Sequence, residues 1–424
     1  MHIGEPKTGT TFLQDVLWAN RPVLAARGIM LPGYNRRDHS RASRDLRQTP
    51  RETSDVADPW TGEWDVLIGQ ALCAPGVAVI SDELLSACTP DQADRAVRSL
   101  AAAEVHVILT ARDVGACLPA EWQETVKCRG TDGWRPWLDA VVAATAAPDR
   151  RDRSWFWSVH DTLELLALWS RHIPAHRVHV ISTPRQPSPE LLWARFASVL
   201  GVEPAGIDLN QARANSSLGY AETEFLRRVN ELLPADVPDW FYTRTVKRIL
   251  AYGVLGSVPA GRRTAVPPEL QHWVKEQSDL LIAGLRESDF DLVGDLSELL
   301  HVRAADRLAA AAGQPAEVVD VAAASAAALA GELYHRMYPE RPPRRSQGGP
   351  RRSLSQFEWR LLHGPLVQRR LRRASHRRSV QHLRVAIWRV LMRPGRWRAA
   401  VPEHADRQAL QPGVVGVGRA SNAA

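Results

Sequence analysis

Cysteine, lysine and long apolar runs are all scarce in this sequence of 424 residues. The cysteines are Cys73, Cys88, Cys117 and Cys128. No two of them stand in Cys-x-x-Cys spacing, so neither a zinc site nor a disulfide framework is indicated. The sequence has no run of eighteen apolar residues and no basic-then-apolar leader, and it therefore predicts neither a membrane-spanning helix nor a secretory signal. We expect a cytoplasmic protein.

Lysine makes up only four of the 54 basic residues, and arginine makes up the rest. The four are Lys7, Lys127, Lys247 and Lys275. An arginine guanidinium is planar and rigid, whereas a lysine ammonium is a compact charge that rotates freely. Lys7 stands in a loop rich in glycine and threonine. Its retention there indicates a need for a small donor that arginine would not satisfy.

Positive charge is concentrated near the C-terminus, although the whole chain carries a formal charge of +7. Residues 341–400 contain seventeen arginines against one acid, Glu358, and residues 401–424 are neutral. Residues 1–340 therefore carry about −9. An anion site in this part of the chain must be built by a few local groups rather than by a general positive field.

The arginine-rich segment follows a stretch rich in proline and glycine at residues 342–350, which indicates a linker. Its apolar residues at helical spacing are Val380, Leu383, Ile387, Val390 and Leu391. The pattern predicts that residues 341–424 form a linker and an amphipathic tail, which binds an anionic membrane surface or nucleic acid through non-specific charge. Such a tail would place the protein peripherally at a membrane. The alternative is that it packs on the acidic remainder of the chain.

Short β-branched runs alternate with amphipathic stretches of helical length in the first half of the chain, which is typical of parallel strands joined by crossover helices. The predicted strands are residues 2–3, 77–81, 105–110 and 178–182. The predicted helices are residues 10–27, 90–103, 162–172 and 189–200. Residues 35–59 are polar and without a clear period, which favours a loop or lid. Residues 221–300 favour helices.

Residues 4–11 read Gly-Glu-Pro-Lys-Thr-Gly-Thr-Thr and separate the first predicted strand from the first predicted helix. Such a loop offers backbone N–H groups and a helix N-terminus to an anion. Thr10 and Thr11 add hydroxyl donors, and Gly9 permits close approach of the backbone. A Walker A loop carries lysine after its second glycine, where this sequence has Thr10, so the loop differs from that of a nucleoside triphosphatase.

Six residues of this loop, Pro6, Lys7, Thr8, Gly9, Thr10 and Thr11, match the pattern Pro-Lys-[Ser/Thr]-Gly-Thr-Thr. In this the sequence resembles the sulfotransferase superfamily, and its actinobacterial members in particular. The resemblance implies that the donor substrate is 3′-phosphoadenosine 5′-phosphosulfate, that Lys7 contacts it near the bridging oxygen, and that residues 8–11 hold the 5′-phosphate. A compact ammonium there would stabilise the charge that builds as the sulfur–oxygen bond breaks. The scheme requires no metal.

Further ligands follow from the same resemblance. In the family a strand ends in arginine, followed eight residues later by serine, and the two hold the 3′-phosphate. Arg112 follows the predicted strand 105–110 and fits the first position as a bidentate ligand; a strand-end salt bridge is the alternative. Position 120 is alanine. Gln123 or Lys127 is then the candidate substitute, unless both lie on a solvated helix face.

Carboxylates follow the predicted strand 77–81, at the end of a sheet where open α/β folds bind ligands. Ser81 and Glu83 match a Ser-x-Glu pair that is usual in this branch of the family, and Glu83 is the candidate general base for the acceptor. The alternative is that Asp82 and Glu83 only open a helix. His39 and His160 are weaker candidates for the base.

Asn215 and Ser217 belong to the segment Asn-Ser-Ser-Leu, which resembles a motif found late in bacterial members of the family. The resemblance places both residues in the nucleotide site. A helix-capping turn before residue 221 explains them equally well.

These features favour a sulfotransferase that acts on a hydroxyl or amine of a small-molecule, carbohydrate or lipid acceptor. The implied fold is α/β, a three-layer P-loop-type parallel sheet flanked by helices, with a helical C-terminal extension. Residues 1–300 would form the nucleotide-binding domain, residues 301–340 an alanine-rich helical extension, and residues 341–424 the tail. The alternatives are a P-loop NTPase or kinase and a non-catalytic adaptor with a vestigial nucleotide site.

Overall fold

The computed structural model describes residues 1–48, 62–210, 217–234, 237–257 and 262–301, together with Val321, Ala322 and Ser325. The chain divides into a unit of residues Met1–Arg341 and a unit of residues Pro342–Ala424. All the elements below belong to the first unit. The tail 341–424 and nearly all of the predicted extension 301–340 lie outside the described residues.

The described residues contain six strands, all in parallel pairs. They are β1 (His2–Gly4), β2 (Ile29–Met30), β3 (Val77–Ala78), β4 (Val107–Ala111), β5 (Val178–Ser182) and β6 (Asp291–Val293). The larger sheet has the order β1-β4-β5-β6, and β2 pairs with β3. Ser81 forms a parallel bridge with His2, so the chain that leaves β3 runs beside β1. The prediction of an α/β fold with a parallel sheet flanked by helices is confirmed.

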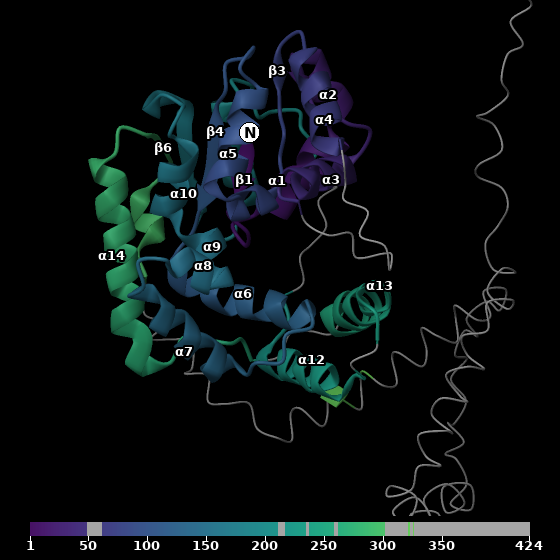
Figure 1. The fold of residues 1–424 in the computed structure, drawn as a ribbon, viewed down its shortest axis with the longest axis vertical. Coiled ribbons are helices and arrows are strands. Elements are labelled where there is room, and N and C mark those ends of the chain that lie inside the picture. Colours follow the sequence, from purple (N-terminus) through teal and green to yellow (C-terminus); the bar gives the residue numbers. More distant parts are fainter. Residues whose placement is uncertain are drawn as a thin grey trace, which may run out of the picture. The chain divides into compact units, whose positions relative to one another are not determined.

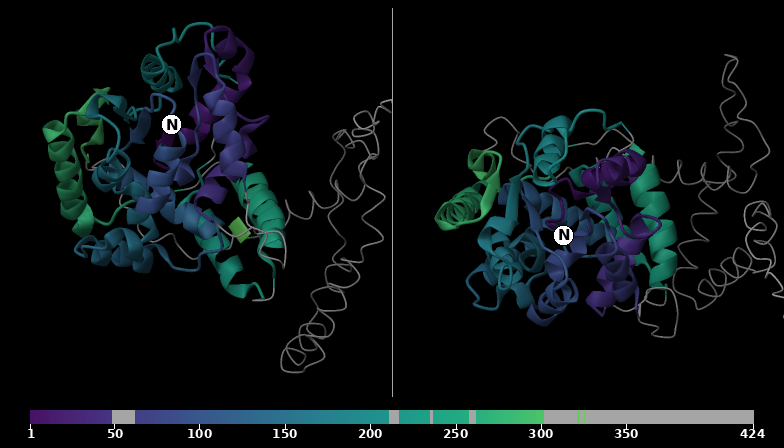
Figure 2. Two further views of the ribbon diagram at one scale, coloured as in Figure 1. Left: turned by 45° about the horizontal axis from the view of Figure 1, so that its top comes forward. Right: turned by 90° about the horizontal axis from the view of Figure 1, so that it is seen from above.

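Helices cover both faces of the larger sheet. Val107 and Leu109 of β4 lie in one hydrophobic core and Ile108, between them, lies in another, because alternate residues of a strand point to opposite faces. The first core is covered by α5 (Pro90–Ser99), α10 (Thr162–Trp169) and α14 (Gln271–Glu287), and the second by α1 (Thr10–Ala19) and α11 (Pro189–Val199). Burial of both faces is typical of parallel sheets. Figure 1 shows α14 on the same side as β6, with α1 to α4 on the opposite side, near β3, and Figure 2 shows the same elements by colour in two further views.

The first unit contains further helical elements. They are α2 (Arg21–Ala26), α3 (Arg36–Leu46), α4 (Glu63–Leu72), α6 (Val114–Lys127), α7 (Trp134–Thr145), α8 (Arg150–Arg153), α9 (Trp155–His160), α12 (Tyr220–Leu232), α13 (Asp239–Tyr242), a π-helix η3 (Thr243–Val254) and the short turns η1 (Glu83–Ala87), η2 (Ala175–Arg177), η4 (Leu255–Ser257), η5 (Pro268–Leu270) and η6 (Leu296–Leu299). A third core joins α6, α7, α12 and η3. No helix among the described residues is both long enough and apolar enough to cross a membrane.

Two predictions about the N-terminal part were wrong. Residues 10–27 form two helices, because the Asn20 side chain donates to the carbonyl of Val16 and ends α1, and α2 then starts with Pro22 near its N-terminus. Residues 36–46 of the predicted loop form α3, with Asn35 and Asp38 in a capping box at its start. The polar composition of α3 hid its period, since three of the five side chains that it buries are polar.

One prediction about strands was wrong. The strand expected over residues 77–81 is limited to β3, which belongs to the smaller sheet. The region 221–300 is mainly helical, as predicted, but it also contains β6 at the edge of the larger sheet. β6 has only three residues and is partly exposed, so it lacks the continuous apolar run by which buried strands are recognised in a sequence.

Burial of His2 predicts that stability depends on pH. The residue is 1% exposed, and its Nδ1 lies 2.8 Å from the Ser81 hydroxyl. Burial, reinforced by the nearby N-terminal ammonium, lowers the pKa of His2 from 6.5 to about 3. Between these values the unfolded state binds the proton and the folded state does not. His2 should therefore lower the unfolding free energy, by up to about 1.4 kcal/mol per pH unit, as the pH falls from 6.5 toward 3.

Urea unfolding of the wild type and of His2→Phe over a series of pH values measures this contribution. The variant keeps an aromatic ring beside Phe196 but does not titrate, so its unfolding free energy should fall less steeply with decreasing pH. Equal slopes for the two proteins would show that His2 does not titrate in this range.

Candidate functional site

A large cleft lies beyond the carboxyl ends of β1 and β4. Its volume is about 1770 Å³, and the loop after β1, the start and one face of α6, and η3 all contribute to its lining. Ten lysine and arginine side chains line it, against six aspartates and glutamates. Because residues 1–340 carry about −9 overall, the cleft is a local concentration of positive charge.

The loop between β1 and α1 has an unusual backbone. Gly9 has φ 95°, and a Cβ atom at this position would lie 2.5 Å from the Leu192 side chain, so glycine is required there. Lys7 also has a positive φ, 62°, a left-handed conformation that a non-glycine residue adopts only when its surroundings hold it. Among the described residues, the amides of Lys7, Thr8 and Gly9 donate no hydrogen bond. They are therefore available to a ligand.

The threonines of the loop have different roles. Thr8 is fully buried, and its hydroxyl contacts the Glu5 carbonyl and the Thr110 hydroxyl, both at 2.5 Å. Only its main chain is left for an anion. Thr10 and Thr11, in contrast, line the cleft together with Pro6, and the Thr10 hydroxyl donates to Glu83.

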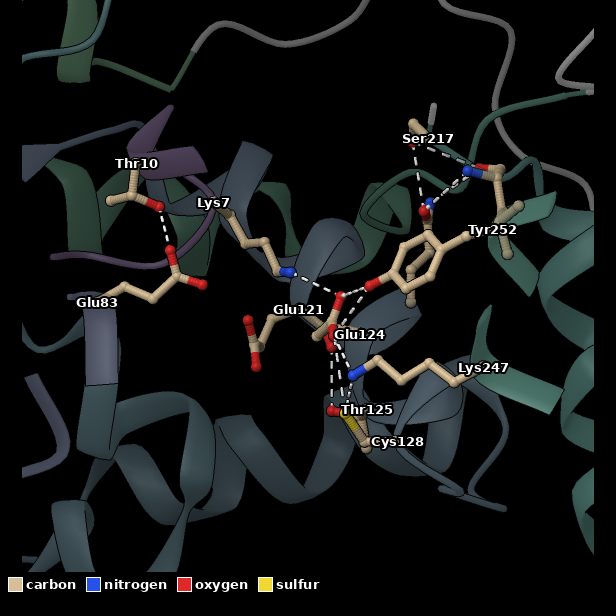
Figure 3. Close-up of polar contacts among 12 residues, drawn as sticks. Lys7, Thr10, Glu83, Glu121, Glu124, Thr125, Cys128, Ser217, Lys247 and Tyr252 are labelled. Carbon is tan, nitrogen blue, oxygen red and sulfur yellow. Dashed lines mark hydrogen bonds and ion pairs between the residues drawn. The ribbon is translucent and has the colours of Figure 1, made fainter. Parts of the chain in front are cut away.

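Lys7 extends across the cleft to Glu124 on α6 (Figure 3). Its Nζ lies 2.9 Å from Glu124 Oε2, and the Nζ of Lys247 lies 2.9 Å from the other oxygen of the same carboxylate. Burial disfavours the Lys7 ammonium, but the carboxylates of Glu124 and Glu121 outweigh it and raise the pKa. Lys7 therefore stays cationic, and an anion that binds it must compete with Glu124.

Arg112 follows β4 and supports the same loop. Its Nη1 donates to the Lys7 carbonyl at 3.0 Å, which stabilises the left-handed turn at Lys7. The predicted alternative, a strand-end salt bridge, is not found among the described residues. A guanidinium has five N–H groups, and Arg112 lines the cleft. It therefore fixes the loop and still presents donors to a ligand.

Asp82 and Glu83 differ in their surroundings, although both stand at the start of η1. Asp82 caps η1, because its Oδ1 accepts a hydrogen bond from the Leu84 amide at 2.9 Å. Burial, with the charge of Glu83 added, raises the pKa of Asp82 to about 6. Glu83 lines the cleft and accepts the Thr10 hydroxyl (Figure 3). Ser81 is buried, and its hydroxyl contacts His2.

Gln123 and Ser217 contact each other and line the cleft. The Gln123 Nε2 donates to the Leu218 carbonyl at 2.9 Å, and its Oε1 accepts from the Leu218 amide at 3.2 Å. The amide of Gln123 thus holds the segment 217–218 in place. Asn215 lies outside the described residues.

Lys127 is the last residue of α6, whereas Arg112 precedes the first turn of this helix. The 14 residues of α6 span about 20 Å at 1.5 Å per residue. The Nζ of Lys127 lies over the ring of Tyr252, 5.1 Å from its centroid. The structure therefore does not bring Lys127 together with Arg112.

Glu124, Lys247 and Tyr252 line the cleft but were not predicted from the sequence as site residues. Lys247 and Tyr252 both come from η3, and the Tyr252 hydroxyl lies 3.5 Å from each oxygen of Glu124. π-Helices are rare and frequently occur at functional sites. The scarcity of lysine was the one signal in the sequence that pointed to Lys247.

His160, a weaker base candidate, lies beneath the loop rather than in the cleft. It is buried, with Nδ1 3.4 Å from Glu5 and Nε2 3.5 Å from Glu121. Burial disfavours the imidazolium, but hydrogen bonds to its neighbours, chiefly Cys117 and Glu121, raise the pKa well above 6.5. His160 links the loop to α6. The other weaker candidate, His39, is buried against the Pro32 carbonyl and Ser81.

Comparison of the whole chain with protein-family models, with curated proteins and with solved structures finds no match.

Proposed function

We propose that the protein is a sulfotransferase that uses 3′-phosphoadenosine 5′-phosphosulfate as its donor. The observation that carries the proposal is the loop after β1, in which Lys7 and unpaired amides border the same cleft as Arg112 and Glu83. A parallel sheet with helices on both faces suits a P-loop-type fold, in which ligands bind beyond the carboxyl ends of the strands. The resemblance of residues 6–11 to the nucleotide loop of sulfotransferases supports the same proposal.

The residues of the cleft fit this donor. The loop amides and the hydroxyls of Thr10 and Thr11 would hold the 5′-phosphate. Arg112 would bind the 3′-phosphate with the N–H groups that the Lys7 carbonyl leaves free.

The donor supplies the sulfuryl group, whose bond to the 5′-phosphate oxygen breaks as the acceptor oxygen or nitrogen bonds to sulfur. Lys7 would leave Glu124 to stabilise the charge that develops on the released oxygen, an interaction stronger in the transition state than before it. Glu83 would accept the proton of the acceptor. Thr10, which donates to Glu83, orients its carboxylate.

Glu83→Gln tests the role of the base. The amide keeps the shape of the side chain and its bond to Thr10 but does not accept the proton, so turnover should fall by a factor of about 100, within the range of general-base catalysis. Affinity for the product 3′-phosphoadenosine 5′-phosphate, measured by calorimetry, should stay nearly unchanged. Normal turnover in this variant would show that Glu83 is not the base and serves only as the first residue of η1.

The function itself is tested by incubating the protein and the donor with a cell extract and searching by mass spectrometry for products that gain one sulfuryl unit. Calorimetry with the donor nucleotide, with and without Mg²⁺, separates the alternatives. A sulfotransferase should bind the nucleotide in either condition. An adaptor with a vestigial site should not bind it, and an NTPase should prefer a nucleoside triphosphate with Mg²⁺.

A further inference from the structure

Three of the four lysines of the chain line one cleft. Lys7 comes from the loop after β1, Lys127 from the end of α6 and Lys247 from η3. The fourth, Lys275, lies on α14 and pairs with Asp279. Arginine replaces lysine at the other 50 basic positions of the chain. The cleft therefore retains compact donors where planar guanidinium groups are the rule elsewhere.

Lys127 is buried and, among the residues that the structure describes, has no carboxylate within ion-pair distance. It is 7% exposed and lines the cleft. Burial lowers its pKa, and the charges of Lys7 and Lys247 lower it further. Glu124 opposes this shift, but both of its oxygens already bind the other two lysines. Placing a lysine in a largely buried position without a carboxylate partner is costly, and an anion bound beside it would offset that cost.

Lys127 and Lys247 adjoin the reacting end of the proposed donor site. Lys7 and Lys247 contact the two oxygens of one carboxylate, each at 2.9 Å, which keeps their Nζ atoms within about 8 Å of each other. Arg112, the proposed ligand of the 3′-phosphate, precedes α6, whereas Lys127 ends this helix, about 20 Å farther along it. A 3′-phosphate bound to Arg112 therefore does not account for Lys127.

We propose that Lys127 and Lys247 form a second oxyanion subsite, which binds a carboxylate, sulfate or phosphate group carried by the acceptor. This inference rests on the proposed function and names the class of acceptor as anionic. Glu124 is the internal counter-ion that the acceptor displaces. Tyr252 backs the subsite, with its ring beside Lys127 and its hydroxyl 3.5 Å from Glu124.

The small number of lysines provides a direct test. The full chain labelled with ¹³C at the lysine ε-carbons gives four signals, which single Lys→Arg variants assign. Inorganic sulfate, the probe, is added to the protein alone and to the protein saturated with 3′-phosphoadenosine 5′-phosphate. The signals of Lys127 and Lys247 should shift in both titrations, with half-saturation on the order of 1–10 mM, as for a small fragment. Lys275 is the internal control and should not shift.

Two variants sharpen the test. Lys127→Met should weaken sulfate binding about tenfold or more, the loss of one hydrogen bond to a charged group, while Lys275→Met should bind sulfate as the wild type does. Glu124→Gln removes the internal counter-ion and should strengthen sulfate binding several-fold.

Three results would overturn the subsite: no shift of Lys127 and Lys247, a shift that the nucleotide abolishes, or an equal shift of Lys275. The first two leave the proposed function standing if the nucleotide alone shifts the signal of Lys7. No response of Lys7 to the nucleotide would instead count against the proposed function.

Discussion

Lys7→Ala is expected to reduce sulfuryl transfer by a factor on the order of 100 or more, the scale seen when one preorganised donor to a developing oxyanion is removed. Binding of 3′-phosphoadenosine 5′-phosphate should fall much less, because the loop amides, Thr10 and Thr11 remain. Lys7→Arg should also be impaired, since a planar guanidinium does not occupy the position of an ammonium at φ 62° in a tight loop. Steady-state kinetics and calorimetry measure the two effects separately.

Lys275→Ala is the matched control, because Lys275 does not line the cleft and pairs, among the described residues, only with Asp279, four residues later on α14. It should leave turnover unchanged. Activity of the wild type should persist in excess EDTA, since no step of the proposed scheme uses a metal. Hydrolysis of a nucleoside triphosphate that needs both Lys7 and Mg²⁺, without sulfuryl transfer to any acceptor, would replace the sulfotransferase by an NTPase.

Arg112→Ala is expected to weaken binding of the nucleotide by about 1.5–3 kcal/mol, or roughly 10- to 150-fold, the range for a hydrogen bond to a charged group. Because Arg112 also donates to the Lys7 carbonyl, the substitution could weaken binding by loosening the loop instead of by removing a phosphate ligand. The comparison that resolves it is calorimetry with 3′-phosphoadenosine 5′-phosphate and with adenosine 5′-phosphate, which lacks the 3′-group. Loss of a 3′-phosphate ligand weakens binding of 3′-phosphoadenosine 5′-phosphate alone, whereas a loosened loop weakens binding of both nucleotides.

The decisive outcome is therefore the preference for the 3′-phosphorylated nucleotide. If Arg112→Ala preserves that preference in full, the residue only positions the loop and the 3′-phosphate binds elsewhere. Arg129→Ala is a useful control, because Arg129 also lines the cleft but donates to the Val237 carbonyl and pairs with Asp239. We expect it to retain the preference.

The parts of the fold that could be predicted from the sequence are those fixed by local pattern. β5 occupies residues 178–182 as predicted, because a run of β-branched residues buried on both faces leaves a clear trace. α3 was missed because its buried face contains the polar residues His39, Ser43 and Asp45. His39 and Asp45 accept hydrogen bonds from the amides of Ser81 and Trp64, which come much later in the chain. β6 has no local signal, and only its pairing with β5 makes it a strand.

The candidate site was predictable where a contiguous motif encodes it, as in the loop that contains Lys7. Glu124 and Lys247 are 123 residues apart and meet only in the folded chain, so no spacing rule connects them. For Lys247, the composition of the chain was more informative than the spacing of its residues. Because the chain has only four lysines, each lysine stands out in the sequence. No feature of the sequence distinguishes Glu124 from the nearby Glu121.

The position of β1 has a consequence for synthesis of the chain. This strand is synthesised before its partners, yet it lies between Ser81 on one side and β4 on the other. The Gly4 carbonyl accepts a hydrogen bond from the Thr110 hydroxyl, which comes 106 residues later. At about 5–20 residues per second, roughly 5–20 seconds pass before that partner exists. During that interval β1 and the Lys7 loop lack the contacts that hold them, and a nascent chain interrupted before residue 110 should be unable to bind the nucleotide.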